Sequence, residues 1–304
     1  MVSNFRKQDE IINGFEIYHD SFKSILGSDP QLIKHATGFE WTEGPAYFHN
    51  GDYLIFSDIP NNRMIKWSDS DGMSVFRESA DFSNGNFADS KGRLITCQHG
   101  TRNITRTEKN GTITNIIDNY QGKKLNSPND LVENSKGDIF FTDPPYGILS
   151  DHEGYKSESE LEKNYVFRFR TDKNVLEILS DEFDKPNGLC FSPDEKYLYV
   201  ADSGDPGDIK SLELNDDYQV ISSKTFAEIR PGVPDGLRVD INGNIFTSAW
   251  DGIQVLNSSA DLIGKILVPE DRTANCCWGG KSKNRLYITA DKSIYSIILN
   301  TIGL

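Results

Sequence analysis

Six residues recur along the chain at one position of a repeated pattern, and most of them carry side chains that could hold a metal ion. Each lies ten or eleven residues before an apolar position in a β-strand-like segment. The six are Glu43, Asn84, Asn129, Asn187, Asp235 and Cys276, and the apolar positions are Leu54, Leu94, Ile139, Leu198, Ile245 and Leu286. Five of the six carry a side-chain oxygen, the ligand atom that hard divalent cations prefer. We call them the repeat residues.

The spacing of the repeat residues predicts the fold that positions them. Successive members lie 41, 45, 58, 48 and 41 residues apart. Each unit has an opening turn, a short strand, a polar hairpin and a β-rich strand, which ends in Ser-Asp in residues 54–58. A period of roughly 40 to 50 residues built from short strands is typical of a propeller blade. We therefore expect an all-β fold, a six-bladed β-propeller with four-stranded antiparallel blades around a central channel.

The whole chain, residues 1–304, is expected to form this single domain. Its N-terminal segment, residues 1–40, is predicted to complete the ring, with a strand around Phe15-Glu16-Ile17-Tyr18 added to the last blade, which would remove a free sheet edge. The third unit is lengthened by a polar insertion, residues 144–163. This insertion either covers one face of the ring or is merely tolerated there.

In a propeller the innermost strand of each blade lines the channel, so the repeat residues should point to a common centre. Glu43, Asn129, Asn187 and Asp235 offer two carboxylates and two amide oxygens. This set favours Ca²⁺, with Mg²⁺, Mn²⁺ or Zn²⁺ as alternatives, although zinc prefers His and Cys. Asn84 is expected to support the site from behind. The competing interpretation is that Asn-Gly and Asp-Gly are ordinary turn dipeptides.

Composition excludes several classes of partner. The net charge of −14 disfavours nucleic acid and anionic membrane surfaces. Apolar runs of 18 residues are absent, and residues 1–7 lack the apolar core of a signal peptide. We expect a soluble cytoplasmic protein, although a mature secreted chain would look similar. The cysteines, Cys97, Cys190, Cys276 and Cys277, lack zinc-site spacing and are expected to be buried thiols.

Taken together, six short segments resemble those of the SMP-30/gluconolactonase/luciferin-regenerating-enzyme-like family, and most closely its bacterial gluconolactonases. The segments are Glu43-Gly44-Pro45, Ser127-Pro128-Asn129-Asp130, Thr142-Asp143-Pro144-Pro145-Tyr146-Gly147, Pro186-Asn187-Gly188, Pro234-Asp235-Gly236 and Trp278-Gly279-Gly280. They lie in five of the six units and extend from the first to the last, so the resemblance covers nearly the whole chain.

The resemblance implies a six-bladed propeller with a divalent cation in the channel. It assigns Glu43, Asn187 and Asp235 as metal ligands, and Asn129 as a ligand or a substrate contact. Some animal members have an Arg two residues before that Asn to hold the substrate, whereas this chain has Ser127. Substrate recognition therefore cannot be transferred from those members.

A cation held by protein oxygens can polarise a lactone carbonyl and stabilise the charge that develops on its oxygen. Asp235 is the candidate catalytic residue, either as general base for a water molecule or as a nucleophile. Coordination to the metal would lower its pKa and weaken it as a base, which is an objection to the first route. His99 and Tyr146 are candidate substrate contacts, whereas Trp250 and Trp278 are expected to pack between blades.

The leading hypothesis is a metal-dependent hydrolase that opens a gluconolactone-type sugar lactone to the aldonic acid. Two alternatives remain open. The same site could act on another lactone or an organophosphate ester, or the propeller could be a binding scaffold with a structural cation. The expected partner is a small-molecule lactone, and the expected assembly is a monomer or a weak homodimer.

Overall fold

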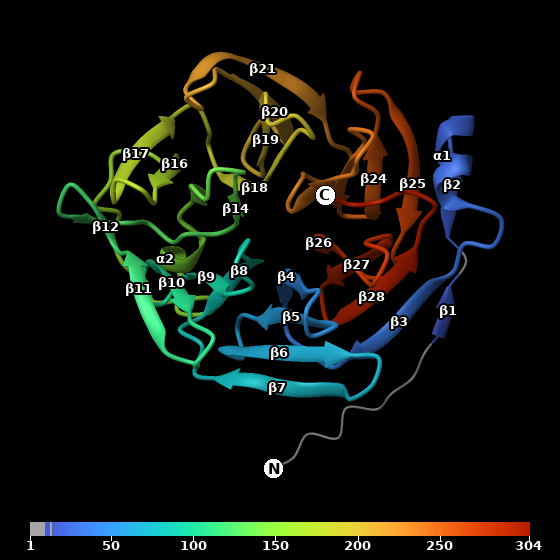
Figure 1. Cartoon of the computed structure of the whole chain (residues 1–304), viewed down its shortest axis with the longest axis horizontal. Coiled ribbons are helices and arrows are strands. Elements are labelled where there is room, and N and C mark those ends of the chain that lie inside the picture. Colours follow the sequence, from blue (N-terminus) through green and yellow to red (C-terminus); the bar gives the residue numbers. More distant parts are fainter. Residues whose placement is uncertain (1–9, 13) are drawn as a thin grey trace.

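The computed structural model describes residues 10–12 and 14–304. Residues 1–9 and 13 belong to the N-terminal segment that was expected to close the ring, and they lie outside the described residues. The described strands form six antiparallel sheets arranged in a ring around a central channel (Figure 1). The prediction of a six-bladed β-propeller with four-stranded blades is confirmed.

The blades follow one another along the chain, and each begins with its innermost strand. Blade 1 contains β4 (Thr42–Phe48), β5 (Tyr53–Asp58), β6 (Arg63–Ser68) and β7 (Gly72–Glu78). Blade 2 contains β8 (Ser83–Ala88), β9 (Leu94–Gln98), β10 (Asn103–Thr107) and β11 (Ile113–Ile117). A short ribbon, β12 (Asn119–Tyr120) and β13 (Lys123–Lys124), precedes blade 3. Blade 3 contains β14 (Leu131–Glu133), β15 (Ile139–Asp143), β16 (Tyr165–Arg170) and β17 (Val175–Ser180).

The remaining blades have the same plan. Blade 4 contains β18 (Pro186–Phe191), β19 (Tyr197–Asp202), β20 (Asp208–Leu214) and β21 (Val220–Glu228). Blade 5 contains β22 (Leu237–Val239), β23 (Ile245–Ala249), β24 (Gly252–Leu256) and β25 (Leu262–Leu267), with β2 (Phe15–Ile17) added at its edge. Blade 6 contains β26 (Thr273–Gly279), β27 (Arg285–Ala290), β28 (Ser293–Ile298), β3 (Leu32–Thr37) and β1 (Glu10–Ile12).

N-terminal and C-terminal segments pair in the last blade, because β3 lies antiparallel to β28. The prediction that residues 15–18 supply this strand is wrong, since β2 pairs with β25 of blade 5. Two helices interrupt the strands of the described chain: α1 (Asp20–Leu26) and α2 (Tyr146–Leu149). Neither has the length and apolar character needed to cross a bilayer.

Apolar side chains between neighbouring blades form the core. Phe140 of β15 and Phe191 of β18 meet edge to face, with ring centroids 5.0 Å apart. Phe246 and Trp278 make the same kind of contact between blades 5 and 6, at 4.9 Å. The predicted packing role of Trp278 is therefore confirmed. Buried aromatic pairs of this kind fix the angle between adjacent blades while adding stability.

The glycine that follows a repeat residue makes the closest contact between blades. Gly85 N donates to Asn129 O at 2.7 Å, and Gly188 N donates to Asp235 O at 3.0 Å. A Cβ on Gly188 would lie 2.4 Å from the same carbonyl oxygen, so a larger residue cannot fit without moving the blades. The prediction that these dipeptides form a turn ahead of the strand is wrong for blade 4. Asn187 and Gly188 lie inside β18, at a register shift.

In blades 1, 3 and 4, an aspartate at the end of the second strand holds the segment that leads into the repeat residue. Asp58 Oδ1 accepts from Glu40 N at 3.0 Å. Asp143 Oδ2 accepts from Asn126 N at 2.8 Å, and Asp202 Oδ2 accepts from Asp184 N at 2.8 Å. In every case the donor lies three residues before a repeat residue: Glu43, Asn129 or Asn187. The strand-ending aspartate of the repeat thus positions the channel-lining residues.

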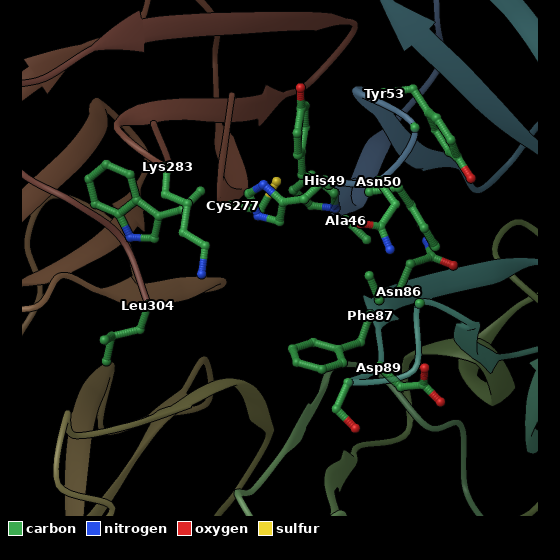
Figure 2. A pocket seen from close by; sticks show the side chains of 18 of the residues that line it. Ala46, His49, Asn50, Tyr53, Asn86, Phe87, Asp89, Cys277, Lys283 and Leu304 are labelled. Carbon is green, nitrogen blue, oxygen red and sulfur yellow. The ribbon is translucent and has the colours of Figure 1, made fainter. Parts of the chain in front are cut away.

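Two cavities occupy opposite ends of the channel, because β4, β8 and β26 each run from one to the other. The rear cavity, of about 500 Å³, is bordered by residues such as Phe87, Asp89, Lys283 and Leu304 (Figure 2). Arg238 of β22 also lines it, and its Nη1 lies 3.2 Å from Asp130 Oδ2. This buried ion pair joins the non-adjacent blades 3 and 5, so it crosses the channel between the cavities.

Candidate active site

The second cavity, of about 290 Å³, opens where the innermost strands begin. We call it the site cavity. It is lined by Trp41, Glu43, Ile59, Asn84, Asn129, Tyr146, Glu153, Asn187, Ser203, Val233, Asp235, Trp250, Arg272 and Thr273. The four proposed ligands, Glu43, Asn129, Asn187 and Asp235, all line this one cavity although they come from four different blades. The repeat therefore does bring their side chains to one place.

Glu43 is held by hydrogen bonds to one of its two carboxylate oxygens. Its Oε2 accepts from Gly44 N at 2.7 Å and from Asn275 Nδ2 at 3.1 Å. These bonds fix the carboxylate while leaving Oε1 available to a bound species. Asn275 was not singled out in the sequence, because the pattern placed the sixth repeat residue at Cys276, one position later, and Asn275 lies in none of the family segments.

Two amide side chains present unpartnered oxygen atoms at the cavity. Asn187 Nδ2 donates to Ser203 Oγ at 3.0 Å, and Asn84 Nδ2 lies 3.2 Å from His99 Nε2. Both Oδ1 atoms are buried and have no hydrogen-bond partner among the described residues. A buried polar atom without a partner is costly, so each oxygen calls for a donor or a cation.

Burial and mutual repulsion hold protons on the carboxyl groups of this cavity. Burial raises the pKa of Glu43 to about 8, and the nearby charges of Asp130 and Glu153 add to the effect. Burial also raises the pKa of Asp235 well above its usual range, and the charge of Glu43 raises it further. A divalent cation between these groups would offset the repulsion and favour their ionised forms.

The sixth repeat residue was assigned wrongly. In each of the first five blades, the apolar strand position pairs with a residue of the innermost strand, and the repeat residue lies four positions before that partner. In blade 1, for example, Leu54 pairs with Tyr47, and Glu43 lies four positions before Tyr47. In blade 6 Leu286 pairs with Trp278, which places Ala274 at that position. Ala274 O accepts from Gly236 N at 2.8 Å, as Asn129 O accepts from Gly85 N and Asp235 O accepts from Gly188 N. Cys276 is instead buried in the apolar core.

His99 and Tyr146, the two candidate substrate contacts, differ in position. Tyr146 begins α2 and lines the site cavity, where burial and the charge of Asp235 raise the pKa of its phenol. His99 does not line the cavity. It lies behind Asn84, and its Nδ1 lies 3.0 Å from Glu153 O. Burial lowers the pKa of His99 to about 4, so its ring is neutral and supports two cavity residues.

Three further residues shape the cavity. Trp250 was expected to pack between blades, but it is 46% exposed and lines the site cavity, with the Arg272 guanidinium 5.2 Å from its ring centroid. The expectation failed because Trp250 follows β23 in the loop above the channel, where it has left the sheet. Glu153 enters the cavity from the 144–163 insertion. Its sequence context carries no repeat register that could have identified it.

The oxygen ligands that the cavity offers suit a hard cation only when the asparagine amide oxygens are included with the carboxylates. In the described part of the chain, no three or more His, Cys, Asp or Glu side chains form a metal-binding group by themselves. Glu43 and Asp235 supply two carboxylates, and Asn84 and Asn187 supply unpartnered amide oxygens. Mixed carboxylate and amide oxygens suit Ca²⁺ or Mg²⁺ better than zinc.

Fold and cavity together define a class of protein: a six-bladed β-propeller with an acidic, amide-rich cavity at one mouth of its channel. The family model described as "SMP-30/Gluconolactonase/LRE-like region" matches residues 41–292. The chain belongs to this family.

Individual relatives agree with that assignment. Gluconolactonase from Zymomonas mobilis is 32% identical over 307 residues, which covers 92% of this chain and 84% of the relative. The structure of a gluconolactonase from Xanthomonas campestris is 33% identical, with a TM-score of 0.92 over 98% of this chain and 100% of that one. A calcium-binding regucalcin from Agrobacterium tumefaciens shares the fold, at 16% identity and a TM-score of 0.73 over 88% of this chain and 93% of that one. This chain is accordingly a lactone hydrolase.

Proposed function

We propose that the chain is a divalent-cation-dependent hydrolase that opens a sugar lactone of the gluconolactone type to the aldonic acid. Glu43, Asn129, Asn187 and Asp235 would hold the cation. Ca²⁺ is the leading candidate, in line with the calcium-binding regucalcin that shares the fold. The two gluconolactonases that match this chain support the sugar-lactone substrate.

One observation carries the proposal. The buried Oδ1 atoms of Asn84 and Asn187 lack partners among the described residues, while both amide nitrogens are engaged by neighbouring side chains. The amides are therefore held with their acceptor atoms free, in the same cavity as two carboxylates whose pKa values are raised. A cation satisfies both the unpartnered oxygens and the repelling carboxylates, whereas a neutral ligand satisfies only the first.

A bound divalent cation supplies Lewis-acid polarisation of the lactone carbonyl. The side chains of the cavity would transfer protons and hold the substrate. Asp235 is the candidate general base for the attacking water, with direct attack by its carboxylate as the alternative. The Tyr146 hydroxyl lies at the cavity wall, where it can hydrogen-bond a ring hydroxyl. Trp41 and Trp250 supply apolar faces against which a sugar ring can pack.

The test is turnover of a lactone panel by the purified protein, before and after chelation and again after CaCl2 is restored. Glucono-1,5-lactone, an aliphatic lactone and an organophosphate ester separate the substrate classes. We expect the sugar lactone to be hydrolysed fastest, activity to be lost on chelation, and activity to return with the cation. Full activity after thorough metal removal would exclude the cation-dependent mechanism, and failure to hydrolyse any lactone or ester would favour a binding scaffold.

A further inference from the structure

The 144–163 insertion brings a third carboxylate, Glu153, to the site cavity beside Glu43 and Asp235. The carboxylate of Glu153 makes no hydrogen bond and no ion pair with any residue in the described ranges. It is nevertheless close enough to Glu43 and Asp235 for its charge to raise the pKa of both. A partly buried carboxylate without a protein donor has lost part of its hydration, so it is available to a bound water molecule or ligand in the cavity.

Several contacts fix the position of Glu153. Its carbonyl oxygen lies 3.0 Å from His99 Nδ1, and this neutral ring donates the hydrogen bond. The next residue, Gly154, lies so close to α2 that a Cβ would be 2.1 Å from Gly147 O. Arg102 Nη1 donates to Ser157 Oγ at 3.1 Å and so holds the following part of the insertion. These contacts hold the backbone of the insertion in place on both sides of the Glu153 side chain.

Glu153 differs from Asp235 in one respect that matters for catalysis. Asp235 belongs to the proposed ligand set, and coordination to a cation would lower its basicity. Glu153 lies outside that set and comes from an insertion rather than from an innermost strand. Its carboxylate lines the cavity and has no hydrogen-bond partner in the described ranges, so it can accept a hydrogen bond from a water molecule there.

We propose that Glu153 is a further catalytic residue, the carboxylate that accepts the proton of the attacking water. This inference rests on the proposed lactone hydrolysis at the same cavity. It assigns a function to the insertion, and it removes the objection that a metal-bound Asp235 would be a weak base.

The proposed step balances. Water oxygen forms a bond to the lactone carbonyl carbon, the carbonyl π electron pair moves to the carbonyl oxygen, and one water proton moves to Glu153. When the tetrahedral intermediate collapses, the bond between the carbonyl carbon and the ring oxygen breaks. The ring oxygen then takes the proton from Glu153 and leaves as a hydroxyl group. The product is the open-chain hydroxy acid, and Glu153 returns to its ionised form.

The first experiment compares Glu153→Gln with a matched control, Glu158→Gln, in the cation-loaded protein. Both residues lie on the insertion, and Glu158 is exposed and outside the cavity. We expect Glu153→Gln to lower kcat on glucono-1,5-lactone by about 100-fold or more, a typical effect of losing a general base. KM should change little, because the glutamine keeps the size of the side chain and the backbone contact to His99. The control should retain wild-type kcat and KM.

Calorimetric titration of the metal-free variants with CaCl2 alone provides a readout besides activity. We expect Glu153→Gln to bind Ca²⁺ as the wild type does, since Glu153 is not assigned as a ligand. A second variant, Glu153→Ala, should recover part of its rate in added sodium formate, because a free carboxylate can replace the missing base. The control should not respond to formate.

The outcomes separate the two proposals. If the wild type is an active, cation-dependent lactonase but Glu153→Gln keeps its kcat within threefold, the role of Glu153 is refuted and the proposed function stands. If Glu153→Gln lowers Ca²⁺ affinity by more than about 100-fold, well beyond the effect of losing a nearby charge, the residue is a ligand and the base assignment is wrong. If the wild type hydrolyses no lactone, the proposed function fails and the role of Glu153 fails with it.

Discussion

At the scale of single residues, Asp235 has the greatest predicted effect on activity. It lines the site cavity, and burial together with the charge of Glu43 raises its pKa. Asp235→Asn keeps the size of the side chain but removes the negative charge that Asp235 offers to a cation in the site cavity. We expect kcat/KM for a sugar lactone to fall at least about 1,000-fold. Steady-state kinetics measure the loss.

The fold should survive this change, because Asp235 contributes its backbone oxygen to the contact with Gly188, and the substitution leaves the backbone in place. Circular dichroism and thermal unfolding should match the wild type. Asp172→Asn, at an exposed position outside the cavity, serves as the matched control and should be fully active. Retention of wild-type turnover by Asp235→Asn would remove Asp235 from the mechanism.

His99 gives a prediction about stability and pH. The pKa of His99 in the folded protein is about 4, below the ordinary 6.5. The contribution of His99 to the free energy of unfolding is therefore fully present above pH 6.5 and is lost as the pH falls toward 4. The stability is lost because His99 binds a proton in the unfolded chain but stays neutral in the folded protein. The stability advantage of the wild type over His99→Gln should therefore shrink by roughly 2 kcal/mol between pH 7 and pH 5.

Urea unfolding of both proteins at the two pH values measures this difference, and effects of other titrating groups cancel between wild type and variant. A stability gap that stays constant from pH 7 to pH 5 would contradict the assignment of a buried, neutral His99.

At the scale of strands and blades, the contact between Gly188 and the carbonyl of Asp235 should be critical. Gly188→Ala places a Cβ 2.4 Å from Asp235 O, so the blades must separate or the hydrogen bond must break. We expect a loss of about 3 kcal/mol in the free energy of unfolding. Activity should fall as well, since Asn187 and Asp235 flank the contact.

Gly72→Ala is the comparison for this prediction. Gly72 has a φ of 71° but open space around its Cβ direction, so only backbone strain of about 1–2 kcal/mol is expected. Denaturant unfolding of both variants separates steric overlap from strain. Equal losses in the two variants would show that the contact between blades does not limit stability.

Element spacing also explains which part of the site could be predicted. Fixed spacing to the next strand identified Glu43, Asn129, Asn187 and Asp235, because the hairpin between the first two strands has nearly the same length in blades 1 to 5. It failed for Cys276, because Leu286 is the second residue of β27 and pairs with Trp278 rather than with the last residue of β26, which moves the repeat position back to Ala274. Glu153 was missed for a different reason. The insertion is not part of the repeated pattern, so its sequence does not show that Glu153 reaches the channel. Only the folded structure shows this.

At the scale of the whole molecule, the propeller was predictable because short strands and polar turns repeat with one period over the entire chain. The packing of Trp278 followed from its place in a strand, whereas Trp250 lies just beyond one, and its exposure depends on loop geometry. The pairing across the channel of Asp130 with Arg238 could not be predicted either. It joins residues of non-adjacent blades, 108 positions apart, that no local pattern relates.

Cation binding should couple to the stability of the whole ring in a pH-dependent way. Burial raises the pKa of Glu43 to about 8 and that of Asp143 to about 7. In metal-free protein these carboxyls keep protons that the unfolded chain releases near pH 4, so stability should fall as the pH rises toward 8. A cation prefers the ionised carboxylates, so the increase in Tm on adding CaCl2 should grow from pH 6 to pH 8.5.

Differential scanning calorimetry of chelator-treated protein, with and without CaCl2, tests this coupling across that pH range. Asp235→Asn should show a smaller shift at every pH. A calcium-induced shift that is constant or decreases with rising pH would contradict cation binding by Glu43 and Asp235.

The ion pair between Asp130 and Arg238 affects how substrate enters and product leaves the channel. Because it crosses the channel between the two cavities, a small molecule that reaches Asp235 can enter and leave only by the mouth that Trp41 and Trp250 border. Entry of the next substrate and departure of the last product are therefore mutually exclusive events at one opening. The hydroxy acid should accordingly act as a competitive inhibitor, and its rate of escape sets an upper limit on turnover.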